Sequence, residues 1–278
     1  MQTCNVFTDT HCHLNFNKFD PDRDEVLRRA EEAGVTRILI PGTSLTSSRS
    51  AVELAESQPG LYAAIGVHPT EVDTLQVDTL AGLRKLASES SRIVAVGEIG
   101  LDYYWDTSPH ELQERLLTEQ LDLAAELALP VVIHFREKGD APDGDCARNL
   151  LKLLGEWVAG LRSGKNPLAG RPGVLHSFSG SLETARAAIG LGFFLGVTGP
   201  VTYRMDRQEL IRQLPLENLL IETDAPFLAP HPQRGKRNEP AYVRLIADKI
   251  ALLHSCSLEE VAAATSQNAR RLFDWKEI

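Results

Sequence analysis

The sequence predicts one (β/α)8 barrel with additional helices at its C-terminal end. First, 278 residues suit a single barrel of about 250 residues plus an extension. Second, eight short β-rich runs alternate with helical stretches. Third, these runs are almost continuously apolar, as expected for parallel strands that helices cover on both faces. We therefore expect one domain spanning residues 1–278.

The predicted strands follow the eight apolar runs in order. They are Asn5–Thr10, Thr36–Ile40, Leu61–Val67, Arg92–Gly97, Pro130–Ile133, Gly173–Leu175, Phe193–Val197 and Leu219–Asp224. Parallel strands joined by helices require right-handed crossovers. The main alternative is an open doubly wound sheet, which usually has a glycine-rich phosphate loop after its first strand. Neither GxGxxG nor a P-loop lysine follows the first run, so the barrel is favoured.

The helical stretches fall between these runs. Asp20 as N-cap, Pro21 at the first turn and Gly34 as a stop delimit the first helix. The longest carries leucines at helical spacing, namely Leu112, Leu116, Leu123 and Leu127. The predicted helices are 21–33, 44–57, 77–89, 108–127, 143–161, 182–191 and 207–213, followed by a helical tail over 239–273. The segment 163–172 is rich in Gly and Pro and reads as a surface insertion.

Composition and charge narrow the class of protein. Charged residues make up 24% and hydrophobic ones 43% of the chain, as in ordinary globular proteins. The net charge of −9 argues against a protein that coats nucleic acid. It leaves room for a nuclease, because divalent cations and the basic segment 234–237 could neutralise a few phosphates. The alternative for that segment is a solvated basic loop.

Cysteine usage and the absence of targeting signals predict a cytoplasmic protein. The four cysteines, Cys4, Cys12, Cys146 and Cys256, show no CxxC spacing, which favours free thiols in a reducing compartment. No signal peptide is visible, and no apolar run approaches the ~20 residues of a membrane span. No membrane association or stable protein partner is implied, and a monomer is the default expectation.

Polar residues at the ends of the predicted strands indicate a metal site. His11 and His13, at i and i+2, point to one face of a strand, whereas Cys12 points to the other. Alone, an HxH pair is weak evidence for a metal. In a barrel, however, residues at the carboxyl ends of different strands converge on one pocket. Further polar residues lie at such ends, namely His68, Glu98, Asp102, His134, His176 and Asp224.

This set is too large for one tetrahedral ion. It suits two cations bridged by a carboxylate, an arrangement that activates water and stabilises both oxygens of an in-line displacement. A neighbouring carboxylate could take the proton of that water. Serine-based catalysis is disfavoured, because Ser177 and Ser179 follow His176 without a GxSxG turn.

Several motifs, in order along the whole chain, resemble the TatD family of metal-dependent deoxyribonucleases, which are amidohydrolase-like barrels. They are TDTHCHL at 8–14, GVHP at 66–69, VGEIGLD at 96–102, PVVIH at 130–134, LHSFSG at 175–180, LIETDAPFL at 220–228 and RGKRNEP at 234–240. Several other amidohydrolases bridge their metals with a modified lysine on the fourth strand. Glu98 occupies that position here, which favours the nuclease-like branch.

The resemblance implies a role for each matching position. One metal would be held by His11, His13, Glu98 and Asp224, and a second by Glu98, His134 and His176. Catalysis would use Asp224, Glu98 and His68, with Asp224 positioning or deprotonating the water and His68 near the scissile phosphate. Asp102 and Glu222 would support the metal ligands from behind. Substrate would also contact a loop at the pocket mouth, through Arg234, Lys236, Arg237 and Asn238.

The expected reaction is hydrolysis of DNA phosphodiesters, from the 3′ end of single strands, with DNA as the substrate partner. The cofactors would be two divalent ions: four histidines favour Zn or Mn, whereas the family's activity is usually described with Mg. Residues 136–141 and 163–172 depart from the family pattern and are expected to shape substrate preference. Alternatives are an ester or amide hydrolase using the same site, such as a D-aminoacyl-tRNA deacylase, and a non-catalytic barrel that binds a partner.

Overall fold

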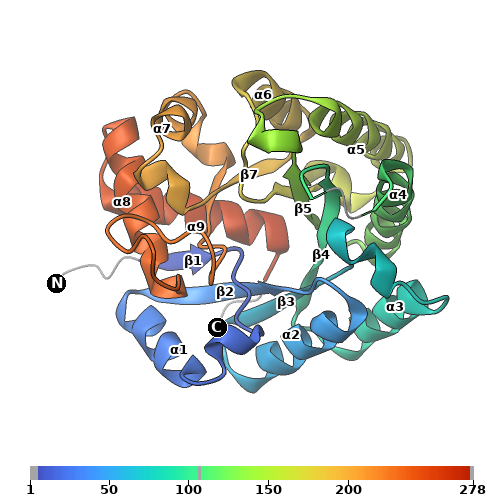
Figure 1. Cartoon of the computed structure of the whole chain (residues 1–278), viewed down its shortest axis with the longest axis horizontal. Helices are drawn as coiled ribbons and strands as arrows, with labels where there is room; N and C mark the ends of the chain where they lie inside the picture. Colours follow the sequence, from blue (N-terminus) through green and yellow to red (C-terminus); the bar gives the residue numbers. More distant parts are fainter. Residues whose placement is uncertain (1–5, 106–107, 276–278) are drawn as a thin grey trace.

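The computed structural model describes residues 6–105 and 108–275 and contains the predicted barrel. Within these residues, eight parallel strands pair in chain order, β1 to β8, around a common axis (Figure 1). Each strand sits beside its neighbour in sequence, which is the arrangement that β-α alternation predicts. The strands are β1 Phe7–Asp9, β2 Val35–Pro41, β3 Leu61–Ile65, β4 Ile93–Asp102, β5 Val131–Arg136, β6 Gly173–Leu175, β7 Phe194–Val197 and β8 Leu219–Ile221.

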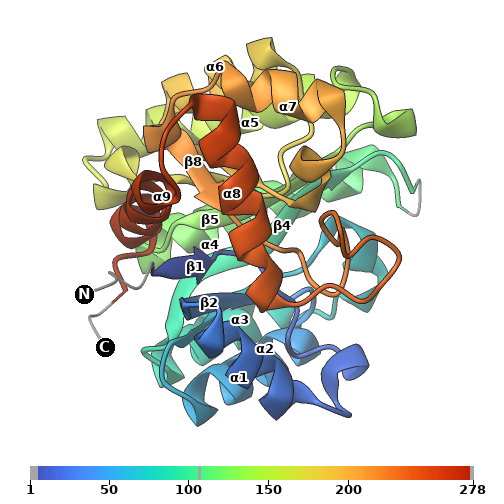
Figure 2. The same cartoon turned by 90° about the vertical axis from the view of Figure 1, so that its left-hand side faces the viewer.

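Helices surround the strands on the outside, and Figure 1 shows them following the colour order of the chain around the ring. They are α1 Arg23–Glu32, α2 Leu45–Ser57, α3 Thr79–Glu89, α4 His110–Leu127, α5 Asp145–Ser163, α6 Leu182–Leu191 and α7 Met205–Arg212. The additional C-terminal helices are α8 Val243–His254 and α9 Leu258–Phe273. Figure 2 shows α8 alongside the barrel and α9 near β1, with which it is in contact. No described helix is long and apolar enough to cross a membrane.

The barrel closes between its last and first strands through the segments that follow them. The Thr10 amide donates to the Ile221 carbonyl at 3.2 Å, and the Asp224 amide donates to the His11 carbonyl at 2.9 Å. The His13 amide then donates to the Ala225 carbonyl at 2.8 Å. Two segments more than 200 positions apart thus run side by side just beyond the strand ends. This pairing brings His11, His13 and Asp224 to one place.

The amino ends of the strands are filled by apolar side chains from the end of the chain. Trp275 is 4% exposed, and its ring centroid lies 4.8 Å from that of Tyr62 in β3. It belongs to one buried cluster with Leu39, Val94, Val132, Val174, Phe194, Leu220, Leu272 and Phe273. This end of the barrel is therefore part of the core, and the polar side chains gather at the carboxyl ends, as barrel architecture predicts.

Several predicted boundaries are wrong. Helix α1 begins at Arg23 after Asp22, not after Asp20, and the Asp22 carboxylate binds Arg237 without capping the helix. Other ends shift by two or more residues: α3, α4 and α5 begin at 79, 110 and 145, β4 extends to Asp102, and β8 ends at Ile221. The segment 163–172 contains a short 3₁₀ helix, Pro167–Gly170. Asn5, the predicted start of the first strand, lies outside the described residues.

The three described cysteines are free. Cys12 is buried, with its sulfur 3.8 Å from the Ala225 carbonyl oxygen. Its thiol thus packs toward the closing segment after β8. Cys4 lies outside the described residues.

Candidate metal centre and pocket

Glu98 is the central residue of the site. It lies within β4 rather than after it, and it is only 3% exposed. Its Oε2 lies 3.3 Å from Nε2 of His11 and 3.7 Å from Nε2 of His13. Its Oε1 lies 3.0 Å from Nδ1 of His134 and 3.2 Å from Nε2 of His176. Each oxygen of one carboxylate therefore faces a different pair of imidazoles.

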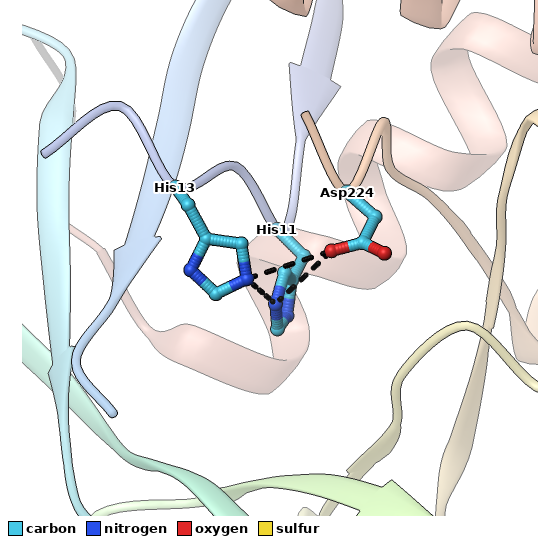
Figure 3. A group of neighbouring side chains, drawn as sticks. All are labelled: His11, His13 and Asp224. Atoms are coloured by element: carbon cyan, nitrogen blue, oxygen red, sulfur yellow. Dashed lines mark hydrogen bonds and ion pairs between the residues drawn. The ribbon is translucent and has the colours of Figure 1, made fainter. Parts of the chain in front are cut away.

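The first group of donors comes from the segments that close the barrel. His11 and His13 bring their Nε2 atoms to 3.3 Å from each other, and Asp224 Oδ1 lies 3.9 and 3.5 Å from these two nitrogens. Figure 3 shows the two rings and one Asp224 oxygen converging, while the second Asp224 oxygen points away. Asp224 has a left-handed φ of 55°, an unusual conformation that Asp tolerates better than most residues.

The second group surrounds the other oxygen of Glu98. His134 lies within β5, His176 directly follows β6, and His68 follows β3. His68 Nε2 lies 3.5 Å from Glu98 Oε1, and its Nδ1 lies 2.7 Å from the Thr70 hydroxyl and 3.2 Å from the Thr70 amide. Thr70 thus fixes the ring so that Nε2 faces the centre.

Asp102 supports His134 from behind. Its Oδ2 lies 3.0 Å from His134 Nε2, so that His134 contacts a carboxylate through each ring nitrogen. Its Oδ1 accepts hydrogen bonds from the amides of Tyr104 and Trp105, at 2.9 and 3.0 Å. The carboxylate therefore links the loop after β4 to the imidazole.

Glu222 occupies the equivalent position behind His176. It is fully buried, and its Oε1 accepts the Ser177 amide and lies 3.3 Å from His176 Nδ1, at an angle unsuited to a hydrogen bond. Its Oε2 accepts the Thr10 hydroxyl at 3.2 Å. A Cβ at Gly196 would clash with this carboxylate in its present position.

Burial and close charges shift the pKa values of the site in opposite directions. Burial raises the pKa of Glu98, but His176, His11 and His68 outweigh this effect and hold it well below its usual value. Burial lowers the pKa of His176, but Glu98 and Glu222 outweigh it and hold it well above 6.5. In the metal-free protein, ionised carboxylates are therefore compensated by protonated imidazole.

This donor set fits divalent cations. Imidazole nitrogens and carboxylate oxygens are the ligands of Zn and Mn, and carboxylates also suit Mg. Donor atoms within 4.8 Å of one another form three groups, of which the first two share His11: His11, His13 and Asp224; His11, His176 and Glu222; and His68, Glu98 and His134. The Nε2 atoms of His11 and His13 face each other at 3.3 Å beside the carboxylates of Glu98 and Asp224. A cation would satisfy such facing lone pairs.

The centre opens into a pocket of about 630 Å³ at the carboxyl ends of the strands. Two aromatic side chains on its lining are unusually accessible: Trp105 is 59% exposed and Phe227 is 43% exposed. The lining also includes Phe16, which stacks on the His13 ring with centroids 4.5 Å apart. Exposed aromatic faces beside a metal centre offer surfaces on which planar groups can stack.

The basic segment after β8 is placed differently from the expectation. Arg237 binds Asp22 through two contacts of 2.7 Å, and Asn238 is fully buried. The side-chain amide of Asn238 donates through Nδ2 to the carbonyls of Thr223 and Phe227, at 2.8 and 2.6 Å. The Asn238 side chain therefore holds the loop that carries Asp224, and Arg237 ties the following segment to Asp22. Contact of either side chain with substrate stays a prediction.

Arg234 and Lys236 remain exposed, but neither lies among the pocket-lining residues that the structure describes. Arg234 stacks over Tyr203 at 4.1 Å, and Lys236 donates to Gln233. Their contact with substrate stays a prediction. The expected site residues His13, His68, Glu98, His134, His176 and Asp224 all line the pocket, and His11 lies beside them.

Sequence reasoning did not single out Arg204 and Arg207, which line the pocket together with Arg136 of the segment 136–141. Arg136 is the last residue of β5, and the other two lie at the start of α7, after β7. Their position after predicted strands could have identified them, because residues that follow barrel strands face the pocket even when they belong to no motif. It also left out Asp9, which is buried and accepts the Thr223 hydroxyl at 2.6 Å, joining the two closing segments.

Comparison with known proteins agrees with this geometry. The family model "TatD related DNase" matches residues 8–274. The metal-dependent hydrolase YabD of Bacillus subtilis is 39% identical over 267 residues, covering 95% of this chain and 98% of that protein. The 3′-5′ ssDNA/RNA exonuclease TatD of Erwinia tasmaniensis is 38% identical over 274 residues, covering 96% and 99%.

A solved structure extends the likeness to three dimensions. The TatD homologue YjjV of Escherichia coli has a TM-score of 0.87 and 34% identity, covering 99% of this chain and all of that one. Both the sequence match and the fold match thus run from the first strand to the last helix. This chain belongs to the TatD family of metal-dependent hydrolases.

Proposed function

We propose that this protein hydrolyses phosphodiester bonds of single-stranded DNA from the 3′ end, with two divalent metal ions as cofactors. The observation that carries the proposal is the division of donors around Glu98. Its Oε2 faces His11 and His13, whereas its Oε1 faces His134 and His176. A carboxylate with a separate set of nitrogens at each oxygen suits a bridge between two cations. Bound there, the ions would supply hydroxide at neutral pH and stabilise charge on the attacking and leaving oxygens.

The side chains around the centre divide the remaining tasks. Asp224 has one oxygen toward His11 and His13, and its second oxygen is free to accept the proton of the attacking water (Figure 3). His68, fixed through Nδ1 by Thr70, presents Nε2 toward Glu98, where it would contact the scissile phosphate. Asp102 and Glu222 would hold His134 and His176 in orientation.

The preference for single strands rests on the lining of the pocket. Trp105 and Phe227 are both exposed at the pocket, and a base can stack on an aromatic ring only when it is not paired within a duplex. The curated relatives include proteins named 3′-5′ ssDNA/RNA exonuclease. DNA is proposed as the substrate partner, and Arg234 and Lys236 as further contacts to its backbone.

The test is cleavage of a 5′-labelled single-stranded DNA oligomer with Mg or Mn. We expect a ladder that shortens from the 3′ end and disappears with EDTA and in Glu98→Ala. Glu126→Ala, which removes an exposed carboxylate paired with Arg84, is the matched control and should cleave normally. If the protein binds two metals yet leaves the DNA intact, the proposed substrate is wrong and the proposed metal centre stands. Aminoacyl-tRNA and small esters would then be the next substrates to assay.

A further inference from the structure

A side arm of the pocket runs from the metal centre toward α7. Ser177 and Thr198 line its beginning, and their hydroxyl oxygens lie 3.1 Å apart. Asp140, Arg204, Arg207 and Leu210 line both the pocket and an adjoining hollow of about 290 Å³, which continues to Gln213. We call this part of the pocket the α7 arm. It makes the pocket longer than the metal centre alone requires.

The α7 arm combines an apolar wall with positive charge. Its apolar side chains are Phe178, Val201, Leu210 and Ile211, all less than 10% exposed. Its charged groups are three arginines and two aspartates. Arg136 pairs with Asp140 at 2.8 Å, and Arg204 binds Asp206 through contacts of 3.1 and 2.8 Å. The third guanidinium, that of Arg207, lies 3.6 Å from the same Asp206, which leaves one positive charge in excess.

Arg207 is held in place without a carboxylate of its own. Its side chain is 13% exposed, and its Nη1 donates to the Ser179 carbonyl, three residues after His176. Burial lowers the pKa of this guanidinium, which means that its charge is incompletely compensated in the protein. A fixed, half-compensated guanidinium on a pocket wall is a binding site for an anion, and its planar fork matches phosphate oxygens.

We propose that Arg207 binds a second phosphate of the nucleic-acid strand, on the 5′ side of the bond being hydrolysed. This inference rests on the proposed exonuclease function and adds the path of the strand. The nucleotide released from a 3′-hydroxyl end carries only the scissile phosphate. Any further phosphate therefore belongs to the remaining 5′ strand, which the α7 arm would hold with a sugar and base against its apolar wall.

The experiment combines substitutions of Arg207 with oligomers in which a single phosphate charge has been removed. Fluorescent single-stranded oligomers carry one neutral methylphosphonate at the first, second or third linkage upstream of the terminal one. Their binding is measured by anisotropy with Ca²⁺ in place of Mg²⁺, for the wild type, Arg207→Met and Arg207→Lys. Arg212→Met is the matched control, because Arg212 lies on the same helix, is paired with Glu209 and lines neither hollow.

In the wild type, we expect one upstream methylphosphonate to weaken binding about tenfold, the size of one charge-assisted hydrogen bond. Arg207→Met should weaken binding to natural DNA by a similar factor. In this variant, a methylphosphonate at that one linkage should no longer change the affinity, whereas the other linkages should behave as in the wild type. Its log–log salt slope should fall by about 0.7. Arg207→Lys should retain the charge and part of the coupling, and Arg212→Met should match the wild type.

Either of two results for Arg207→Met would overturn the subsite. Arg207→Met could bind every oligomer as the wild type does, or it could weaken binding equally at all linkages without coupling, as a purely structural role through Ser179 predicts. Failure of the proposed function looks different. If one linkage couples to Arg207 in the binding assay but DNA is not cleaved with Mg or Mn, the phosphate subsite stands and the proposed exonuclease function is wrong. Absence of oligomer binding by the wild type would reject the subsite.

Discussion

The carboxylate of Asp102 lies 3.0 Å from Nε2 of His134, whose Nδ1 lies 3.0 Å from Glu98. The imidazole is thus held at both nitrogens, and Asp102 is itself fixed by two backbone amides. Burial raises the pKa of Asp102, but the contact with His134 outweighs it and holds the pKa below its usual value. The Asp102 carboxylate therefore orients an imidazole of the candidate metal centre.

Removing this charge should weaken metal binding without unfolding the protein. Asp102→Asn keeps the shape but loses the carboxylate, and we expect the affinity for Mn or Zn to fall about 10- to 100-fold. Isothermal titration of the metal-free protein measures the change. Asp145→Asn, at an exposed carboxylate paired with Arg148, is the control. Equal metal affinity in Asp102→Asn and wild type would show that Asp102 does not act through His134.

Metal binding should release protons near neutral pH. The pKa of His176 is held well above 6.5 by Glu98 and Glu222, so its ring keeps a proton that a metal must displace. Metal affinity should therefore rise with pH above 6.5. The stability of the metal-free fold depends on pH in the opposite direction. The raised pKa of His176 stabilises the folded state below pH 6.5, and this stability is lost as the pH rises through the folded-state pKa.

Titration at pH 7 in two buffers of different ionisation enthalpy counts the released protons. Glu222→Gln removes one of the charges that raise the pKa of His176, while an amide oxygen can still accept the Ser177 amide. This variant should release fewer protons than the wild type. If the wild type released none at pH 7, the protonated state assigned to His176 would be wrong.

The sequence predicted the fold and the central donors because both depend on local signals. Apolar runs separated by helices specify the strands, and barrel architecture then brings the polar residues after the strands together. Glu98 shows the limit of this reasoning, because it lies inside β4 and not at the end of a strand. The strand continues to Asp102 by pairing with β5, and that pairing is tertiary information.

Roles that depend on long-range partners could not be read from the sequence. Arg237 and Asn238 look like phosphate contacts in a basic motif, yet Asp22 and the carbonyls of Thr223 and Phe227 occupy them. Conversely, Arg207 stands in no motif, and only its contact with Ser179 and its place in the pocket make it notable. Sequence separation hides both kinds of contact.

Asn238 should stabilise the fold more than it binds substrate. Asn238→Ala leaves the carbonyls of Thr223 and Phe227 without these buried hydrogen bonds, which should cost about 2–3 kcal/mol. Thermal unfolding should occur roughly 3–5 °C lower. Lys236→Ala, on an exposed neighbour, should change stability by less than about 0.5 kcal/mol. A variant with an unchanged Tm and a raised KM for DNA would restore the substrate-binding role.

Trp105 and Phe227 should distinguish single strands from duplexes. Each presents an accessible ring at the pocket, and stacking of one base contributes roughly 1–3 kcal/mol. Trp105→Ala and Phe227→Ala should each weaken binding of a single-stranded oligomer about tenfold or more, while binding of a blunt duplex changes little. Leu252→Ala, at a still more exposed apolar side chain on α8, is the control for lost surface area. Binding is measured by anisotropy in Ca²⁺, so the comparison does not depend on turnover. Both aromatic variants could instead lose affinity for single strands and duplexes alike. The rings would then support the loops after β4 and β8 and would not stack on bases. The preference for single strands would have to arise elsewhere in the pocket.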